Sequence, residues 1–476
     1  MRNLIFAPDT RKWFTLAAVS FGLFMIMLDN TVVNVALPSI ERDLHATLSE
    51  LQWIVTGYAL TFAALMLVGG KIADAYGRRR IFVIGIAVFT ISSLLCGLAS
   101  TSNELIGARI LQGAGAALMN PATLSIIAAT FPPRERGTAI GIWAGTSALA
   151  LAIGPLVGGL ITEHFTWNWI FFVNVPIGIL GIGASYVFID ESRDETHERL
   201  DLPGLASSAL GLFALTYGLI EANKYGWTSP RIVGSFVVAA VSFLVFVLLE
   251  RHQRAPMLPL GLFGNRTYTG ANLTMLLVAL AMFGVFFFVS LYMQNILGYS
   301  AVQAGAAFLP MTVLIILVAP LAGRTSDRLG SRGLMTVGML LISLQLLLFS
   351  QVGEHTSYWQ LLPCLVIGGI GMAFTMTPSA AAATRSVPVD KAGVGSAVLN
   401  SARQVGGTMG IAVMGAIVAS QIGRVPTPDA FMTGFTDALL VAAAIAAAGA
   451  VVAFTLVRPH AEASSARSEQ LPEPVA

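Results

Sequence analysis

Two charged residues stand inside long apolar stretches of the sequence. Asp29 follows the run Phe-Met-Ile-Met-Leu, and Arg109 follows Leu-Ile-Gly-Ala. A carboxylate in the middle of a membrane-spanning helix costs about 2.5 to 3.5 kcal/mol on insertion scales, so such a residue is a candidate for function. A carboxyl group in that position can load a proton from one side of a membrane and release it to the other.

Arg109 also shares a helical face with uncharged neighbours. Arg109, Gln112, Gly113 and Ala116 recur at spacings of three, four and seven, which places them on one side of a helix. Glycine and alanine on such a face allow a second helix to approach closely. Close packing explains the small residues but not the arginine, so we expect this face to turn inward.

The composition shows which elements must position these residues. Hydrophobic residues make up 55% of the 476 residues and charged residues 11%, whereas a typical soluble chain is about a quarter charged. The apolar residues lie in runs of about 17 to 25, the length of a membrane-spanning helix. Runs such as 273–292 lack the alternation of a barrel strand. We therefore predict an all-α integral membrane protein with both termini on one side.

The expected spans number fourteen, and the first is a retained helix rather than a signal peptide, because its run continues to Pro38 without a small-residue cleavage site. The approximate ranges are 13–35, 51–68, 81–98, 105–128, 138–161, 169–188, 205–219, 232–249, 272–292, 304–321, 334–352, 361–377, 397–419 and 435–455.

The loop charges predict the orientation. With the N-terminus in the cytoplasm, 21 of the 27 Lys and Arg residues lie on the cytoplasmic side, which is where a positive excess belongs. Both termini are then cytoplasmic in a multi-pass protein of the cell membrane. Asp29 and Arg109 fall in the outer halves of their helices on this topology, so they can form a pair. That pair is either linked to proton movement or a constant salt bridge that joins two helices.

One loop pattern occurs twice, after the second and the tenth spans. Gly70, Asp74 and Gly77 have the same spacing as Gly323, Asp327 and Gly330, and arginine follows in both copies, as Arg78 to Arg80 and as Arg332. Parallel repeats of six helices are an architecture of secondary transporters. We expect a six-helix bundle at 1–190, two inserted helices with their loops at 191–268, a second six-helix bundle at 269–457, and a disordered cytoplasmic tail at 458–476.

Several motifs in this order resemble one family. They are Leu28-Asp29 through Asn34 to Pro38, Trp53 to Tyr58, Gly70 to Arg80, Arg109-Ile-Leu-Gln112-Gly113, Gly154-Pro155-Leu-Val-Gly158-Gly159, and Trp167-Asn-Trp169 through Asn174 to Pro176. Together they resemble the major facilitator superfamily and, within it, the fourteen-helix drug:proton antiporters of the multidrug efflux type. Asn168 is a departure, since the family often has arginine there.

The resemblance implies roles for three groups of residues. Gly154, Pro155, Gly158 and Gly159 correspond to the motif of antiporters and exporters, although proline and glycine in a helix also produce a plain kink. The two repeated loops correspond to charge contacts that latch the inner gate, and their charges also set orientation. Asp29 corresponds to the proton carrier and Arg109 to its modulator.

A substrate cavity is expected from polar and aromatic residues in the spans. Methionine and phenylalanine in the stretch 282–293 can line an adaptable cavity, although such runs also face lipid or core. Arg403 shares a face with two of the candidates, and we interpret it as part of a solvated helix end. Glu221 is interpreted as an interface residue. The expected cavity residues are Asn34, Trp53, Tyr58, Gln112, Phe287, Asn400 and Gln404.

Together with these features, the resemblance implies a proton-coupled exporter of hydrophobic or amphipathic compounds. Its expected partners are the lipid bilayer, protons and a small substrate, with no nucleic acid, nucleotide, cofactor or metal. No GxxxxGK[ST] loop occurs, which excludes a built-in ATPase of that type. A dedicated exporter of one endogenous metabolite, lipid or siderophore is an alternative. A non-transporting sensor and a membrane-embedded enzyme are less favoured, since the spans hold few acids and no histidine cluster.

Overall fold

The structure is a computed structural model that describes residues 8–193, 201–253, 256, 258–388, 392–422 and 427–458. Within these ranges, fourteen helices are long and apolar enough to cross a membrane. Thirteen of them contain an expected span whole, and Ser331–Phe349 covers the span expected at 334–352 except its last three residues. The predicted fold class is confirmed. The expected tail, apart from Arg458, lies outside the described residues.

The first half of the chain forms α2 to α8, followed by the inserted helices. Their bounds are α2 Pro8–Leu44, α3 Leu48–Tyr76, α4 Arg78–Leu98, α5 Ser102–Thr130, α6 Pro133–His164, α7 Trp169–Phe172, α8 Asn174–Phe188, α9 Leu202–Tyr225 and α10 Pro230–His252. The short α7 and α8 together make one span across 169–188.

The second half forms α11 to α17 after a short 3₁₀ turn. The bounds are η1 Leu260–Gly264, α11 Arg266–Leu291, η2 Tyr292–Ile296, α12 Ala301–Ala307, α13 Leu309–Leu329, α14 Ser331–Phe349, α15 Tyr358–Arg385, α16 Ala392–Ile422 and α17 Pro428–Leu456. The π-turn η2 extends α11, and α12 and α13 together make one span.

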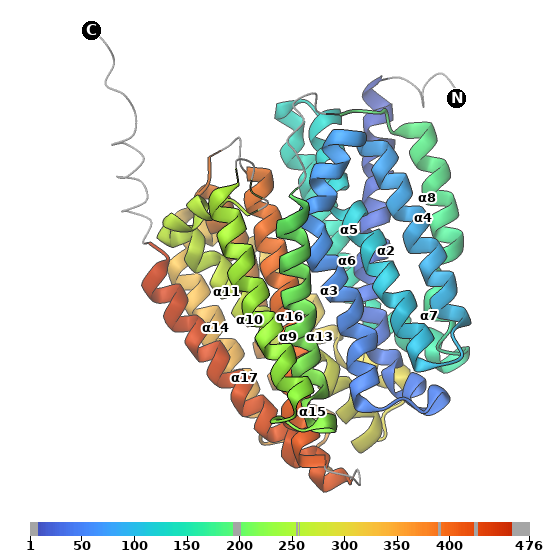
Figure 1. The fold of residues 1–476 in the computed structure, drawn as a ribbon, viewed down its shortest axis with the longest axis vertical. Helices are drawn as coiled ribbons and strands as arrows, with labels where there is room; N and C mark the ends of the chain where they lie inside the picture. The colour runs from blue at the N-terminus through green and yellow to red at the C-terminus, as the bar shows by residue number, and fades with distance from the viewer. Residues whose placement is uncertain are drawn as a thin grey trace.

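The two halves lie side by side, the first in blue to green and the second in yellow to red (Figure 1). The start of α2 at Pro8 and the end of α17 at Leu456 lie at the same end of the molecule. We call this end the terminal face, and the opposite end, where α2 stops at Leu44, the far face.

The helices extend beyond the apolar runs that predicted them. α2 continues through Pro38 to Leu44, although the apolar run stops at this proline. Arg42 Nε donates a hydrogen bond to the Pro38 carbonyl at 3.2 Å, within the last turns of the helix. Polar residues can therefore complete a helix whose middle crosses the membrane, and hydropathy alone underestimates its length.

The inserted pair α9 and α10 packs against both halves, with α9 in contact with α3 and with α16. Glu221 of α9 is 8% exposed and accepts hydrogen bonds from Ser49 Oγ at 2.7 Å and from Trp53 Nε1 at 3.1 Å, both on α3. Asn223 of α9 donates to the Ala416 carbonyl of α16 at 2.7 Å. Glu221 thus lies where α9 packs against α3.

Candidate functional site

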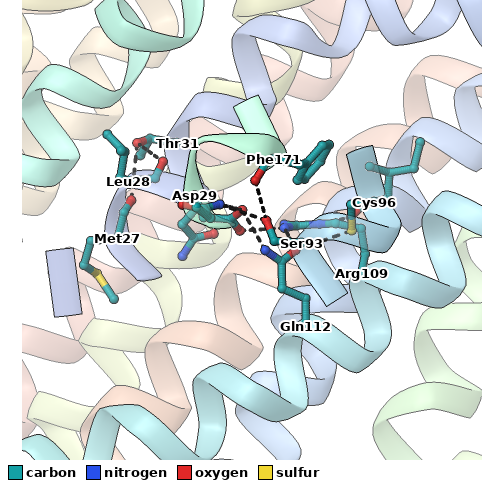
Figure 2. Close-up of polar contacts among 12 residues, drawn as sticks. Met27, Leu28, Asp29, Thr31, Ser93, Cys96, Arg109, Gln112 and Phe171 are labelled. Carbon is teal, nitrogen blue, oxygen red and sulfur yellow. Dashed lines mark hydrogen bonds and ion pairs between the residues drawn. The ribbon is translucent and has the colours of Figure 1, made fainter. Parts of the chain in front are cut away.

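The buried centre of the first half is an ion pair between α2 and α5. Arg109 Nη1 lies 2.5 Å from Asp29 Oδ2, and each of the two side chains is 1% exposed. Figure 2 shows the two side chains converging from different helices. The sequence identified both residues as chemically unusual, and the structure brings them together.

Two amides complete the surroundings of the Asp29 carboxylate. Gln112 Nε2 donates to Asp29 Oδ1 at 3.0 Å, and Asn174 Nδ2 donates to the same oxygen at 3.4 Å. Gln112 lies one turn from Arg109 on α5, whereas Asn174 is the first residue of α8. Three side chains therefore hold the ionised carboxylate, and a charged group is stable in the interior only when such partners satisfy it.

Arg109 is itself held on several sides. Its Nη1 donates to Gln112 Oε1 at 2.6 Å and its Nε donates to the Ile54 carbonyl of α3 at 3.1 Å. The Arg109 Cζ atom lies 4.2 Å from the centroid of the Tyr58 ring and 5.7 Å from that of Phe171. Cation–π attraction from two aromatic rings thus adds to the hydrogen bonds. Together these contacts fix the position of the guanidinium.

A second layer of polar groups supports the first. Asn174 Nδ2 also donates to Ser93 Oγ at 3.0 Å, and Ser93 Oγ donates to the Phe171 carbonyl at 2.9 Å (Figure 2). Cys96 Sγ donates to Gln112 Oε1 at 3.6 Å. These contacts add α4 and α7 to the site. The network is continuous, so moving one helix changes the partners of the central carboxylate.

The sequence did not identify Asn174, Ser93 and Cys96 as members of this site. Asn174 was noted only as part of the motif that enters the sixth span, and Cys96 only as a residue of an apolar run. An uncharged polar side chain in an apolar helix is a weak signal, because it is also satisfied by its own backbone. Asn174 stands where α7 ends and α8 begins, a break within the span that was expected to be continuous at 169–188.

The expected cavity residues of the first half lie in several different environments. Tyr58 is fully buried beneath Arg109, and its hydroxyl has no hydrogen-bond partner among the described residues. Gln112 is fully buried within the Asp29 network. Trp53 is half-buried and donates to Glu221, while the half-buried Asn34 donates to the Asn30 carbonyl. Tyr58 and Gln112 therefore belong to the ion-pair centre and do not line an open cavity in this conformation.

The expected residues on the second half divide into two groups. Phe287 of α11 is fully buried and packs edge-on against Phe288, with ring centroids 4.8 Å apart. Asn400 and Gln404 lie on α16 beside Arg403. Arg403 was expected at a helix end, and that position was wrong, because α16 begins at Ala392, three turns earlier. The residue is half-buried, and its Nε atom is buried.

The glycines of the antiporter motif bring α6 against two partners. A Cβ atom on Gly158 would lie 2.8 Å from the Val32 carbonyl oxygen of α2, and one on Gly159 would lie 2.5 Å from the Ala301 carbonyl oxygen of α12. Only glycine allows backbones to approach so closely. The motif therefore packs α6 against α2, three residues beyond Asp29, and against the second half of the chain.

The repeated motifs at the terminal face are mostly helical rather than loops, which corrects the sequence prediction. Only Gly77 separates α3 from α4, and only Gly330 separates α13 from α14. Their φ angles are +110° and +86°, a region that favours glycine. A single glycine reverses the chain direction in each case, so the motif residues before it remain in helices.

Each repeated aspartate forms an ion pair within its own half. Asp74 Oδ1 lies 2.7 Å from Arg78 Nε, and Asp327 Oδ1 lies 3.0 Å from Arg385 Nη1 at the end of α15. Arg332 instead stacks on Phe454 of α17, 4.0 Å from the ring centroid. The two copies thus resemble each other in chain path but differ in the partners of their charges.

The two halves are joined by hydrogen bonds toward the far face. Ser290 Oγ donates to the Asn34 carbonyl at 2.8 Å and Gln294 Nε2 donates to the Val35 carbonyl at 2.9 Å, so α11 and η2 hold α2. Gln52 Nε2 of α3 donates to the Ile411 carbonyl of α16 at 2.9 Å. The far face is therefore closed by direct contacts between the halves.

Comparison with known proteins places these features in a wider context. The sequence profile of the Major Facilitator Superfamily matches residues 19–411 and 271–476. The chain is 37% identical over 421 residues to the tetracenomycin C resistance and export protein of Streptomyces glaucescens, covering 87% of this chain and 77% of that one. It is 37% identical over 471 residues to a puromycin resistance protein of Streptomyces alboniger, covering 96% and 93%.

Solved structures show the same fold. A bacterial homologue of the human lysosomal transporter Spinster, in an inward-facing and unoccupied conformation, superposes with a TM-score of 0.65 at 17% identity. The match covers 98% of this chain and 99% of that one. At this identity the likeness concerns the arrangement of helices, and it covers nearly the whole length of both proteins.

Proposed function

Because the chain belongs to the major facilitator superfamily and is a multi-pass membrane protein, we propose that it exports hydrophobic or amphipathic small molecules across the cell membrane in exchange for protons. Such a protein is a carrier that exposes its binding site alternately to each side of the membrane, and it breaks no covalent bond. The names of its relatives, which include tetracenomycin C, puromycin and multidrug resistance proteins, support export of such compounds.

The observation that carries proton coupling is the buried pair of Asp29 and Arg109. In the ionised state Asp29 accepts hydrogen bonds from α5 and α8. Protonation would neutralise the carboxylate and leave Arg109 without its counter-charge, and breaking a buried pair in this way costs about 3 to 5 kcal/mol. Loading a proton would therefore loosen α2 from α5, which is a large effect for a single ionisation.

The same helix connects the pair to the contact between the halves. The Asn34 and Val35 carbonyls that accept hydrogen bonds from the second half lie five and six residues beyond Asp29 on α2. A helix transmits a shift along its axis over so short a distance, because one turn spans only about 5.4 Å. We infer that protonation of Asp29 shifts α2 and so alters the contacts that close the far face. Gly158 of α6 packs against α2 beside this segment.

We propose that the terminal face is cytoplasmic. The excess of Lys and Arg in the loops on that side supports this orientation, since positive loops remain in the cytoplasm. The closed far face is then the outer side, and the conformation is one in which substrate enters from within. The substrate would be released outward after the Ser290 and Gln294 contacts with α2 separate.

The test is efflux from energised inverted vesicles, with proton release followed by a pH-sensitive dye. The natural chain should release protons when a hydrophobic drug is added, and Asp29→Asn should abolish both drug and proton movement. Asp429→Asn, which removes an exposed carboxylate at the start of α17, is the matched control and should retain both. Drug-linked proton movement that survives in Asp29→Asn would make the pair purely structural.

A further inference from the structure

The inserted helix α9 reaches both halves of the chain at the far face. α9 ends at Tyr225, α3 begins at Leu48 and α16 ends at Ile422, and α9 packs against both of these helices. Figure 1 shows α9 along the line where the two halves meet. The last turns of α9 therefore lie beside the start of α3 and the end of α16, which belong to different halves.

The polar contacts of α9 with the first half centre on Glu221. This side chain is 8% exposed, and its Oε1 atom accepts hydrogen bonds from Ser49 Oγ at 2.7 Å and from Trp53 Nε1 at 3.1 Å. The Trp53 ring also lies 6.5 Å, centroid to centroid, from the ring of Tyr217, one turn earlier on α9. Hydrogen bonds to a carboxylate are about twice as strong as those between neutral groups. These contacts attach α9 firmly to α3.

The hydrogen bond from α9 to the second half comes from Asn223, two residues beyond Glu221. Its Nδ2 atom donates to the Ala416 carbonyl of α16 at 2.7 Å, and its Oδ1 atom accepts from Trp227 Nε1 at 3.1 Å. An amide oxygen accepts and an amide nitrogen donates, so the hydrogen bond from Trp227 sets the orientation of the amide. Trp227 thereby holds the donor of Asn223 toward α16.

This contact lies nearer the far face than the hydrogen bond that joins α3 to α16 directly. Gln52 of α3 donates to the Ile411 carbonyl. Ala416 lies five residues beyond Ile411 toward the end of α16, about 7.5 Å along the helix axis. When the far face opens, α3 and α16 must separate at this level. α9 cannot then keep its partners on both helices.

The contact with the second half is the weaker of the two. α9 has two hydrogen bonds to a carboxylate and one aromatic contact with α3, whereas Asn223 and Ala416 share one hydrogen bond between neutral groups. α10 packs on α9. On opening, the hydrogen bond to α16 should therefore break first, and the inserted pair should stay with the first half.

We propose that the inserted pair is a clasp, carried by the first half, that holds the far face closed through the hydrogen bond from Asn223 to the Ala416 carbonyl. Glu221 anchors the clasp on α3, and Trp227 positions its releasing group. This inference rests on the proposed function, because it names the contact that regulates opening of the carrier.

The test measures how often the far face opens in chains that carry Ser290→Cys. Ser290 is fully buried where α11 meets α2, so a membrane-impermeant maleimide reaches a cysteine there from the far face only when that face opens. Labelling rates are measured in intact cells and in inverted vesicles, because the far face meets the reagent in one of the two. The chain without Ser290→Cys gives the background from the buried Cys96 and Cys364.

Asn223→Asp should speed labelling about threefold or more, the effect of losing one hydrogen bond between neutral groups. The aspartate has nearly the same shape and still accepts from Trp227, but its carboxylate cannot donate to the Ala416 carbonyl. Trp227→Phe leaves the donor of Asn223 in place but not its orientation, so a smaller increase is expected. If Asn223→Asp does not give a stable protein, Asn223→Ala takes its place with the same expected direction.

Asn168→Ala is the matched control for these variants. Asn168 Nδ2 donates to the Gly97 carbonyl at 2.9 Å, a similar hydrogen bond that lies within the first half, so labelling should change less than about twofold. Equal labelling rates in Asn223→Asp and Asn168→Ala would overturn the clasp.

The outcomes distinguish the clasp from the proposed export. Drug efflux from inverted vesicles is followed in the natural chain and in Asn223→Asp. Faster labelling of Asn223→Asp, together with a natural chain that moves no drug, would support the clasp and overturn export. Drug efflux by the natural chain, together with unchanged labelling in Asn223→Asp, would support export and overturn the clasp.

Discussion

Asn174 donates a hydrogen bond to Asp29 although 145 residues separate them in the chain. The contact links the break between α7 and α8 to the carboxylate on α2. Asn174 also donates to Ser93 of α4 at 3.0 Å. The sixth span is therefore attached to the ion pair and is not merely an outer helix of the bundle.

Asn174→Ala should slow proton-coupled efflux. The change removes one donor to the Asp29 carboxylate and leaves Ser93 with one contact fewer, a loss of about 1 to 3 kcal/mol for a buried polar group. Efflux from inverted vesicles and thermal melting of the purified chain are the measurements. Asn168→Ala is the control, because Asn168 donates to the Gly97 carbonyl at 2.9 Å and does not touch Asp29. Similar efflux in the two variants would contradict a coupling role for Asn174.

Arg109→Gln should destabilise the chain more than the double variant Asp29→Asn/Arg109→Gln. The single change leaves a buried carboxylate without its counter-charge, at a cost of about 3 to 5 kcal/mol, whereas the double change removes both charges. The melting temperature in detergent should therefore fall in the single variant and partly recover in the double variant. Transport should be absent from both. Recovery of transport in the double variant would show that the pair is a structural tie without a role in coupling.

Gly159→Ala should weaken the closed far face. The added Cβ would lie 2.5 Å from the Ala301 carbonyl oxygen, so α6 and α12 must separate. In a chain that also carries Ser290→Cys, a membrane-impermeant maleimide added on the far face should label that cysteine faster than in the parent. Gly183→Ala is the matched change, because a Cβ there meets nothing within 4 Å. Unchanged labelling in Gly159→Ala would indicate that the contact between α6 and α12 tolerates the methyl group.

Arg385→Asp should reduce stability only slightly through its ion pair with Asp327, because the two side chains are 41% and 68% exposed. Exposed ion pairs contribute about 0.2 to 1 kcal/mol. Arg385 also donates to Ser326 Oγ and Ser331 Oγ at 3.0 Å, so transport should suffer more than the ion pair alone explains. The exchange Asp327→Arg/Arg385→Asp keeps opposite charges at the two positions and so separates the effect of the ion pair from that of the serine contacts. Full recovery of efflux in the exchanged chain would mean that the charge pair alone matters.

Much of the fold follows from the sequence for a simple reason. A membrane interior requires every backbone group to be satisfied within a helix, so runs of apolar residues locate the fourteen spans. The ends of those spans were less certain, since helices such as α2 and α3 continue into polar residues that hydropathy does not recognise. The Gly70 to Arg80 segment was expected as a loop for that reason, and it is helical except for Gly77.

The sequence by itself determined that Asp29 and Arg109 were unusual, because a charged residue within a membrane-spanning apolar run is costly and is a candidate for function. Only the tertiary structure decided what surrounds each charge. It paired Arg109 with Asp29, whereas Arg403 Nε has no hydrogen-bond partner among the residues that the structure describes, although both arginines stand in apolar helices. Helical spacing indicates which residues share a face, whereas the partner of that face depends on how distant helices pack, and that packing brings Asn174 to Asp29 across 145 residues.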